Sequence, residues 1–142
     1  MSRMIFVNLP VADLDAAKAF YEAIGATNNP QFTDETAACM VFSDTIFVML
    51  LTHEKFAQFT TKTIADAHAT SEVLLCVSED NREGVDEITE KALAAGGRET
   101  REKQDHGFMY GRSFEDLDGH IWEPMWMDMA AATEAMAAPA EA

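Results

Sequence analysis

The clearest structural signal in the chain is the segment Phe114-Glu-Asp-Leu-Asp-Gly-His-Ile-Trp-Glu-Pro-Met-Trp126. Asp118-Gly119 is typical of a tight turn, because glycine adopts a positive φ without steric cost. Apolar and aromatic runs flank this turn, from 108 to 114 and from 121 to 127, so the segment predicts a β-hairpin. Glu123 is the one carboxylate inside the apolar second strand, and such an acid needs a partner or has a function. We therefore expect Glu123 to lie on the wall of a pocket.

The first half of the chain predicts a β-α-β-β unit. Residues 4–9 form an apolar run typical of a strand, and Asp13 stands at the N-cap position of a helix from about 14 to 24. Two further apolar runs, 37–42 and 46–52, are expected to form a hairpin.

The second half of the chain repeats this order of elements. A strand is predicted at 72–77, followed by a helix to about residue 95 that ends at Gly96-Gly97, and the hairpin around Asp118-Gly119 closes the unit. Two copies of one unit should pack by pseudo-twofold symmetry. The predicted fold class is therefore α+β, with two βαββ(β) modules that form a curled mixed sheet around a cleft.

The predicted organisation is one domain followed by a tail. Residues 1–128 are expected to form the domain, with module 1 at about 3–52, a polar connecting arm at 53–71 and module 2 at about 72–128. Residues 129–142 are rich in Ala and Glu, and we expect them to be disordered and without function.

Two motifs in the chain resemble those of the vicinal-oxygen-chelate superfamily, which includes glyoxalases, bleomycin-resistance proteins, extradiol dioxygenases and fosfomycin-resistance transferases. The segment Val11-Ala-Asp-Leu-Asp-Ala-Ala-Lys-Ala-Phe-Tyr-Glu-Ala-Ile-Gly25 is similar to the pattern V-x-D-L-x-x-x-x-x-F-Y-x-x-x-G. Residues 114–123 are similar to F-x-D-P-D-G-x-x-x-E. The resemblance covers roughly residues 3–128 and implies a homodimer, but it does not fix the chemistry, because this fold hosts many activities.

The resemblance also implies four positions that hold a metal ion in metal-dependent members. In this chain they fall on Phe6, Leu50, Glu72 and Glu123. Two carboxylates without an imidazole suit zinc or nickel poorly, although a hard ion such as Mg²⁺ accepts water as its remaining ligands. We therefore expect no obligatory cofactor, with a divalent metal at Glu72 and Glu123 as the alternative. Without an ion, the two facing carboxylates should repel, which raises one pKa and lets them share a proton.

The strand faces that carry these glutamates are expected to line a largely apolar cleft. Tyr110 and Arg112 could anchor a carboxylate or phosphate group there, or Arg112 could pair with Glu115 or Glu123. His120 is expected to be exposed in the hairpin turn, and Trp122 and Trp126 should pack against helices or a partner subunit. The candidate substrate-binding residues are Phe6, Asn8, Leu50, Leu74, Tyr110, Arg112 and Met125.

Composition limits the possible partners. With 25 acidic and 10 basic residues the formal net charge is −15, which argues against nucleic acid and anionic membranes as partners. No apolar run is long enough to cross a bilayer. Cys39 and Cys76 fit two buried, reduced thiols in a cytoplasmic protein.

Two functions remain open from the sequence. In the first, a glyoxalase-like lyase or isomerase acts on a small oxygenated substrate, with Glu123 as the base and Glu72 as its partner. In the second, a non-catalytic protein of the bleomycin-resistance type sequesters a cationic aromatic compound in the cleft between the modules. The missing metal ligands, the apolar lining and the acidic charge favour the second.

Overall fold

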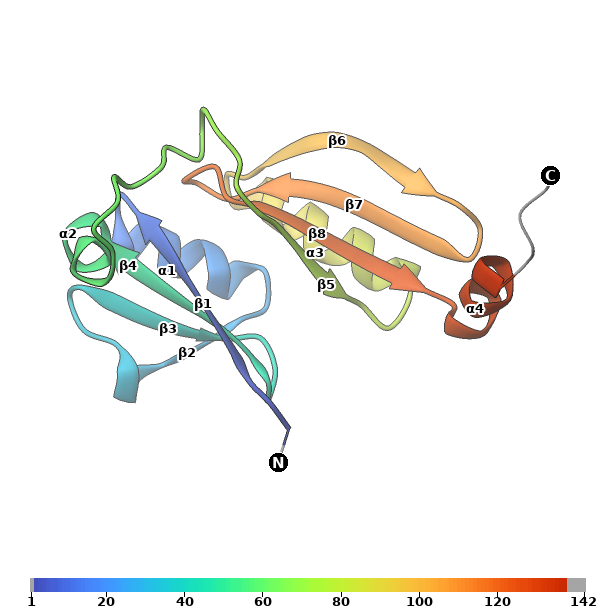
Figure 1. Ribbon diagram of the computed structural model, residues 1–142, viewed down its shortest axis with the longest axis horizontal. Coiled ribbons are helices and arrows are strands. Elements are labelled where there is room, and N and C mark those ends of the chain that lie inside the picture. The colour runs from blue at the N-terminus through green and yellow to red at the C-terminus, as the bar shows by residue number, and fades with distance from the viewer. Residues whose placement is uncertain (1, 138–142) are drawn as a thin grey trace.

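Two four-stranded sheets, each backed by one long helix, make up the structure (Figure 1). The computed structural model describes residues 2–137. The predicted α+β class with two repeated modules is confirmed, because each half has the order strand, helix, strands. The two sheets are separate units with corresponding orders, β1-β4-β3-β2 and β5-β8-β7-β6, rather than one continuous curled sheet.

Module 1 has one parallel and two antiparallel strand pairs. β1 runs parallel to β4, and β3 pairs antiparallel with both β4 and β2. Its elements are β1 (Ile5–Val11), α1 (Leu14–Ala23), β2 (Thr27–Asn29), the 3₁₀ turn η1 (Pro30–Phe32), β3 (Ala37–Val41) and β4 (Ile46–Thr52).

Module 2 repeats this pairing, with β5 parallel to β8 and β7 antiparallel to both β8 and β6. Its elements are β5 (Leu74–Ser78), α3 (Arg82–Ala94), β6 (Arg98–Asp105), β7 (Met109–Glu115) and β8 (Ile121–Met127). The connecting arm between the modules begins with the short helix α2 (His53–Phe56) and the 3₁₀ turn η2 (Ala57–Phe59).

Helix α1 begins and ends where its sequence signals predict. The side chain of Asp13 accepts a hydrogen bond from the backbone nitrogen of Ala16 at 3.0 Å, which satisfies a free donor of the first turn. The chain leaves the helix through Gly25, whose φ of 108° would strain any other residue. Between these ends, Phe20 and Tyr21 are almost fully buried. The helix therefore delivers two aromatic rings to the interior of the molecule.

One hydrophobic core serves both modules. Phe20 and Tyr21 of α1 belong to the same buried cluster as Phe114 of β7 and Trp122 of β8. The ring of Tyr21 meets that of Trp122 edge to face, with ring centroids 6.0 Å apart. Such aromatic pairs add to the free energy gained by burying apolar surface. The prediction that Trp122 packs against a helix is confirmed, and the two modules are joined by side-chain packing as well as by the connecting arm.

The C-terminal segment differs from the prediction of disorder. Residues Met129–Ala137 form the helix α4, and Ala132 on this helix is buried. Alanine is the strongest helix former, and Asp128 supplies a capping acceptor for the backbone nitrogen of Ala131 at 3.1 Å. The rest of the predicted tail, 138–142, lies outside the described residues.

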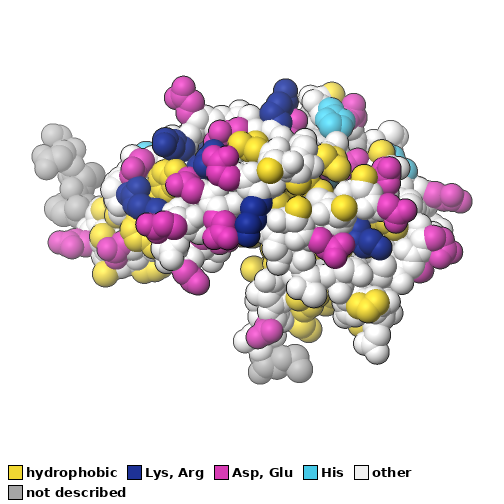
Figure 2. All heavy atoms as spheres, turned by 180° about the vertical axis from the view of Figure 1, so that it is seen from behind, with side chains coloured by type: hydrophobic (Ala, Val, Ile, Leu, Met, Phe, Trp, Pro, Cys, Tyr) yellow, Lys and Arg dark blue, Asp and Glu magenta, His cyan; other side chains and the backbone are white. Residues whose placement is uncertain are grey.

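The surface of the molecule is acidic and partly apolar. Figure 2 shows Asp and Glu side chains spread over one whole side of the molecule, among fewer Lys and Arg.

Of the two cysteines, Cys39 is buried as expected, whereas Cys76 is exposed, so the expectation that both thiols are buried was wrong for Cys76. None of the described helices is long and apolar enough to cross a membrane.

Candidate functional site

A cavity of about 450 Å³ lies between the two modules, underneath the connecting arm. Strand β1 of module 1, the start of β5 and the turn between β7 and β8 form its walls, and the arm forms its roof. Figure 1 shows the arm crossing from one module to the other above this place. Much of the lining is apolar, as is usual for small-molecule sites. The apolar side chains that line it include Val7, Leu9, Phe56, Ile64, Leu75 and Ile121.

The connecting arm lies close against the turn between β7 and β8. A Cβ atom added to Gly119 would lie 2.7 Å from the carbonyl carbon of Ala67. Within the arm, Asp66 forms its own turn, because its carboxylate accepts from the backbone nitrogen of His68 and its carbonyl accepts from the Thr70 hydroxyl. The roof is thus a loop held by its own hydrogen bonds, and it contacts the wall of the cavity at Gly119.

A buried hydrogen-bond network fixes the hairpin wall to module 1. The hydroxyl of Tyr21 donates to Oδ2 of Asp116 at 2.6 Å, and Nε1 of Trp122 donates to the Tyr21 oxygen at 2.9 Å. The other oxygen of Asp116 accepts from the backbone nitrogens of Asp118 and His120, both at 2.9 Å. Burial is the main cause that raises the pKa of Asp116, and burial likewise raises the pKa of Tyr21.

Two further contacts tie the same turn to the end of β1. Nε2 of His120 lies 2.7 Å from the carbonyl oxygen of Pro10, and the backbone nitrogen of Ala12 donates to Asp118 at 2.9 Å. His120 is therefore half-buried at the cavity wall, not exposed as the turn position suggested. We call Asp116, Asp118 and His120, with their partners in module 1, the inter-module latch.

The two glutamates that were expected to face each other are not brought together. In the pairing of β5 with β8, the residue opposite Glu123 is Cys76. Glu72 lies four positions before Cys76, outside the strand, which corresponds to roughly 13 Å along it. Glu72 instead lines the cavity, whereas Glu123 forms an ion pair with Arg101 at 2.8 Å. A shared proton between the glutamates is therefore excluded in this arrangement.

Leu50 does not lie on the predicted binding face. Its exposed fraction is 0% because it belongs to the core beneath α1. The register pairs Phe6 with Phe47 and Asn8 with Met49, so Phe47 and Met49 are β4 residues that share the open face of the sheet (the face away from the long helix) with Phe6. The alternation of Phe47 and Met49 along β4 was the sequence signal for the correct face.

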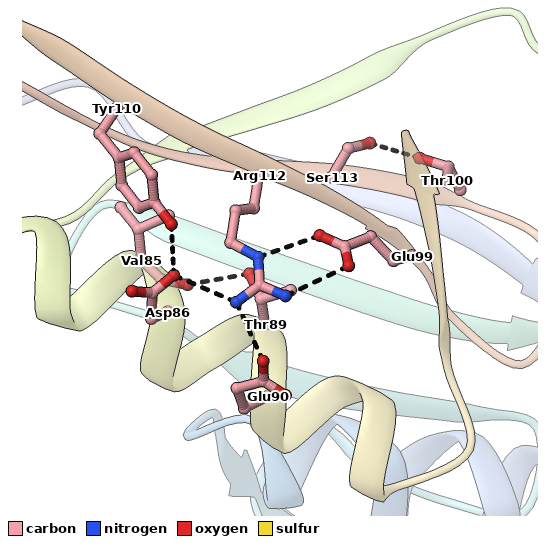
Figure 3. Close-up of polar contacts among 9 residues, drawn as sticks. All are labelled: Val85, Asp86, Thr89, Glu90, Glu99, Thr100, Tyr110, Arg112 and Ser113. Atoms are coloured by element: carbon pink, nitrogen blue, oxygen red, sulfur yellow. Dashed lines mark hydrogen bonds and ion pairs between the residues drawn. The ribbon is translucent and has the colours of Figure 1, made fainter. Parts of the chain in front are cut away.

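Tyr110 and Arg112 point toward α3 (Figure 3), and neither residue lines the cavity. The Tyr110 hydroxyl donates to Asp86 at 2.6 Å, and Arg112 donates to Asp86 and Glu90 of the helix, both at 3.1 Å. Arg112 also makes two hydrogen bonds to Glu99 of β6. Neither of the pairings considered from sequence, with Glu115 or Glu123, is the observed one. Arg112 is thus fully used in holding α3 on its sheet.

The remaining predicted residues divide between the cavity and the open faces. Asn8 lines the cavity. Leu74 and Met125 lie on the open face of the second sheet with Glu123, because they alternate in step with Cys76 and Glu123 along the paired strands. Phe6 is half-exposed on the open face of the first sheet and stacks on Phe47, with ring centroids 4.6 Å apart.

The side chains at the four implied metal positions do not fit a metal site. No group of three His, Cys, Asp or Glu side chains close enough to hold an ion occurs within residues 2–137. The two carboxylates are separated, and the one in the strand is paired with an arginine. A divalent ion at Glu72 or at Glu123 would find a single protein carboxylate, which is too few ligands for a dedicated site.

One family model and several solved structures resemble this chain. A family model described as bleomycin resistance protein-like N-terminal matches residues 3–43. The structure of hypothetical protein SA1046 from S. aureus is 27% identical, with a TM-score of 0.73, 89% of this chain covered and 95% of that one. A glyoxalase/bleomycin resistance protein/dioxygenase family enzyme from Burkholderia phytofirmans PsJN is 20% identical, with a TM-score of 0.72 and coverages of 89% and 99%.

The chain is thus similar to bleomycin resistance protein-like proteins over residues 3–43, and it shares the fold of glyoxalase/bleomycin resistance/dioxygenase proteins. The fosfomycin resistance protein FosX from Listeria monocytogenes shares the fold at 20% identity, with a TM-score of 0.63, 89% of this chain covered and 91% of that one. No curated protein matches the chain. The likeness to these solved structures concerns the fold.

Proposed function

We propose that this chain is a small-molecule binding protein that holds a partly apolar ligand in the cavity between its modules. The observation that supports this function is the cavity itself. Its volume of about 450 Å³ falls in the range of ligand sites, and apolar side chains from both modules and from the arm line it. A ligand there would contact all three parts of the molecule at once.

Binding is favoured over glyoxalase-like chemistry by the state of the carboxylates. A general base needs a free lone pair within reach of the proton it removes. One oxygen of Glu123 is already engaged by Arg101, and Glu72 is too far along the chain to act with it. Neither glutamate has the partner that the lyase or isomerase hypothesis requires.

A lyase or isomerase that uses Glu123 alone is the second candidate. Its support is that the Glu123 side chain is only 18% exposed and lies opposite Cys76 on the open face of the second sheet. Turnover of a small oxygenated substrate that Glu123→Gln abolishes, with binding retained, would establish it. If turnover survives in Glu123→Gln, this carboxylate has no part in the mechanism.

We also propose a homodimer in the cytoplasm. β1 and β5 are edge strands, and large apolar side chains at their starts are exposed, among them Ile5, Phe6 and Leu74. Edge strands and apolar patches of this kind are common contact surfaces. Sedimentation of the native chain and of Phe6→Ser would test the dimer: a native monomer at micromolar concentration contradicts it. Two free thiols suit a reducing compartment.

The binding function can be tested with a variant that fills the cavity from its roof. Thr63 lines the cavity and its side chain is exposed, so Thr63→Trp should occupy the space without disturbing the core. Thr61 is an exposed residue of the same type that does not line the cavity, so Thr61→Trp is the matched control. A panel of single-ring compounds is titrated while backbone amide resonances are recorded. We expect binding to native protein and to Thr61→Trp but not to Thr63→Trp; equal binding by all three would refute the site.

A further inference from the structure

The polar groups of the cavity lining are mostly engaged within the protein. The hydroxyl of Thr60 accepts from the backbone nitrogen of Lys62 at 3.1 Å, and that of Ser71 donates to the carbonyl of Val73 at 3.5 Å. Thr70 donates to Asp66 at 3.2 Å, and Nε2 of His120 is held by Pro10. A hydrogen-bonding group that is already satisfied contributes little to holding a ligand.

Two uncharged polar side chains in the lining remain available. In the described part of the chain, neither the amide of Asn8 nor the hydroxyl of Thr63 makes a hydrogen bond. Asn8 belongs to the wall formed by β1, and Thr63 belongs to the roof formed by the arm. A polar group of a ligand between wall and roof could therefore donate to or accept from the Asn8 amide on one side and the Thr63 hydroxyl on the other.

The charged residues of the lining do not select an ion. Lys62 and Glu72 carry opposite charges and are both exposed, so they lie where water screens them. The remaining wall is largely aliphatic and aromatic, and moving an ion into such surroundings without a partner is unfavourable because the ion loses its hydration. Acidic side chains are spread over the face of the molecule seen in Figure 2, so the net charge of −15 can attract cations to the protein without holding them in this cavity.

We propose that the cavity selects a neutral, largely apolar molecule of about one ring that carries a single hydrogen-bonding group, such as an alcohol or a phenol. This inference rests on the proposed binding function and makes it specific. The apolar body of the ligand lies against Leu9, Leu75 and Ile121, and its polar group bonds to Asn8 or Thr63. This neutral ligand differs from the cationic aromatic ligand that the acidic composition favours.

Three probes of similar shape and different charge test this selectivity: benzyl alcohol, benzylamine in its protonated form, and benzoate. Each is titrated into the native chain at neutral pH while amide resonances of the cavity residues are followed. We expect benzyl alcohol to bind at least about tenfold more tightly than either ion, because the ions lose hydration that the lining does not replace. Tighter binding of benzylamine or benzoate would overturn the neutral class while leaving the cavity as a site. Failure of every probe to bind would overturn both proposals.

Two variants separate the polar contact from the apolar one. Asn8→Leu should weaken benzyl alcohol about threefold to tenfold, as expected for one hydrogen bond, and should leave toluene unchanged or slightly tighter. Thr61→Leu is the control outside the lining and should change neither affinity. An equal loss for toluene and benzyl alcohol in Asn8→Leu would show that Asn8 shapes the wall rather than bonding the ligand, which contradicts the assigned contact. Because Asn8 is exposed on an edge strand, the variant is expected to fold, and circular dichroism checks this.

Discussion

The phenolic oxygen of Tyr21 lies 2.6 Å from Oδ2 of Asp116, although 95 positions separate the two residues in the chain. Tyr21 comes from the helix of module 1, and Asp116 follows the last residue of β7 in module 2. Both groups are buried, so water does not compete for the bond. This contact, with Trp122 donating to the same hydroxyl, is the centre of the inter-module latch.

Removing the Tyr21 hydroxyl should weaken the whole molecule. Tyr21→Phe leaves a buried carboxylate oxygen and the Trp122 nitrogen without this partner, so we expect a loss of about 2 kcal/mol in the free energy of unfolding. Tyr110→Phe is the control, because its partner Asp86 keeps an arginine and its loss should stay near about 0.5 kcal/mol. Urea unfolding measures both variants. Equal losses in the two variants would mean that the Tyr21 contact in the inter-module latch stabilises the protein no more than the Tyr110–Asp86 contact does.

Asp116 should make the native state less stable as the pH rises. Burial raises its folded-state pKa above the unfolded value, so the folded chain binds this proton more tightly. The stabilisation is then complete below the unfolded pKa and is lost as pH rises through the folded pKa. Asp116→Asn lacks this titration, so the stability of the native chain relative to the variant should fall from pH 3 to pH 8. A relative stability that increases over this range would show that the hydrogen bonds to the carboxylate outweigh its burial.

Gly119 should be intolerant of a side chain for two separable reasons. Its φ is 91°, and a Cβ would lie 2.7 Å from Ala67. Gly107 has a φ of 80° and nothing within 4 Å of its Cβ position, so Gly107→Ala measures the backbone cost alone, about 1 kcal/mol. Gly119→Ala should cost about 1–3 kcal/mol more, because the arm must move. Thermal unfolding of the two variants gives the difference. Identical costs would show that the arm yields freely at this contact.

Arg112 should not be replaceable by lysine. Its planar guanidinium bonds three carboxylates from two elements, and a single ammonium group cannot reproduce that geometry (Figure 3). We expect Arg112→Lys to lose about 2 kcal/mol of stability. Arg98→Lys, at a side chain that is 76% exposed, should change it by less than about 0.5 kcal/mol. Chemical denaturation of both variants distinguishes a structural arginine from a dispensable one.

The fold was predictable because its signals are local. The Asp13 cap, the Gly25 stop and the Asp118-Gly119 turn each act within a few residues, and each is found where the pattern places it. The repeat of one unit then requires little further information. The helix α4 was missed because the Ala-rich composition was interpreted as low complexity, although alanine also favours helices.

The site was less predictable because it depends on register between distant strands. The offset of four residues that separates Glu72 from the position opposite Glu123 is set by how β5 and β8 slide past each other. Leu50 was assigned to the wrong face by a shift of a single residue, which inverts every side chain on a strand. The role of His120 depends on Pro10, 110 positions away, and no spacing in the sequence indicates that contact.

The shared aromatic core has a consequence for the chain as a whole. Phe20 and Tyr21 from one half are buried against Phe114 and Trp122 from the other, while the peptide that joins the halves is largely exposed. The covalent link between the two modules therefore contributes only the entropy saved by keeping them close together. A protease nick near residue 61 should therefore leave two fragments that stay associated, and fragments expressed separately should reconstitute the native assembly.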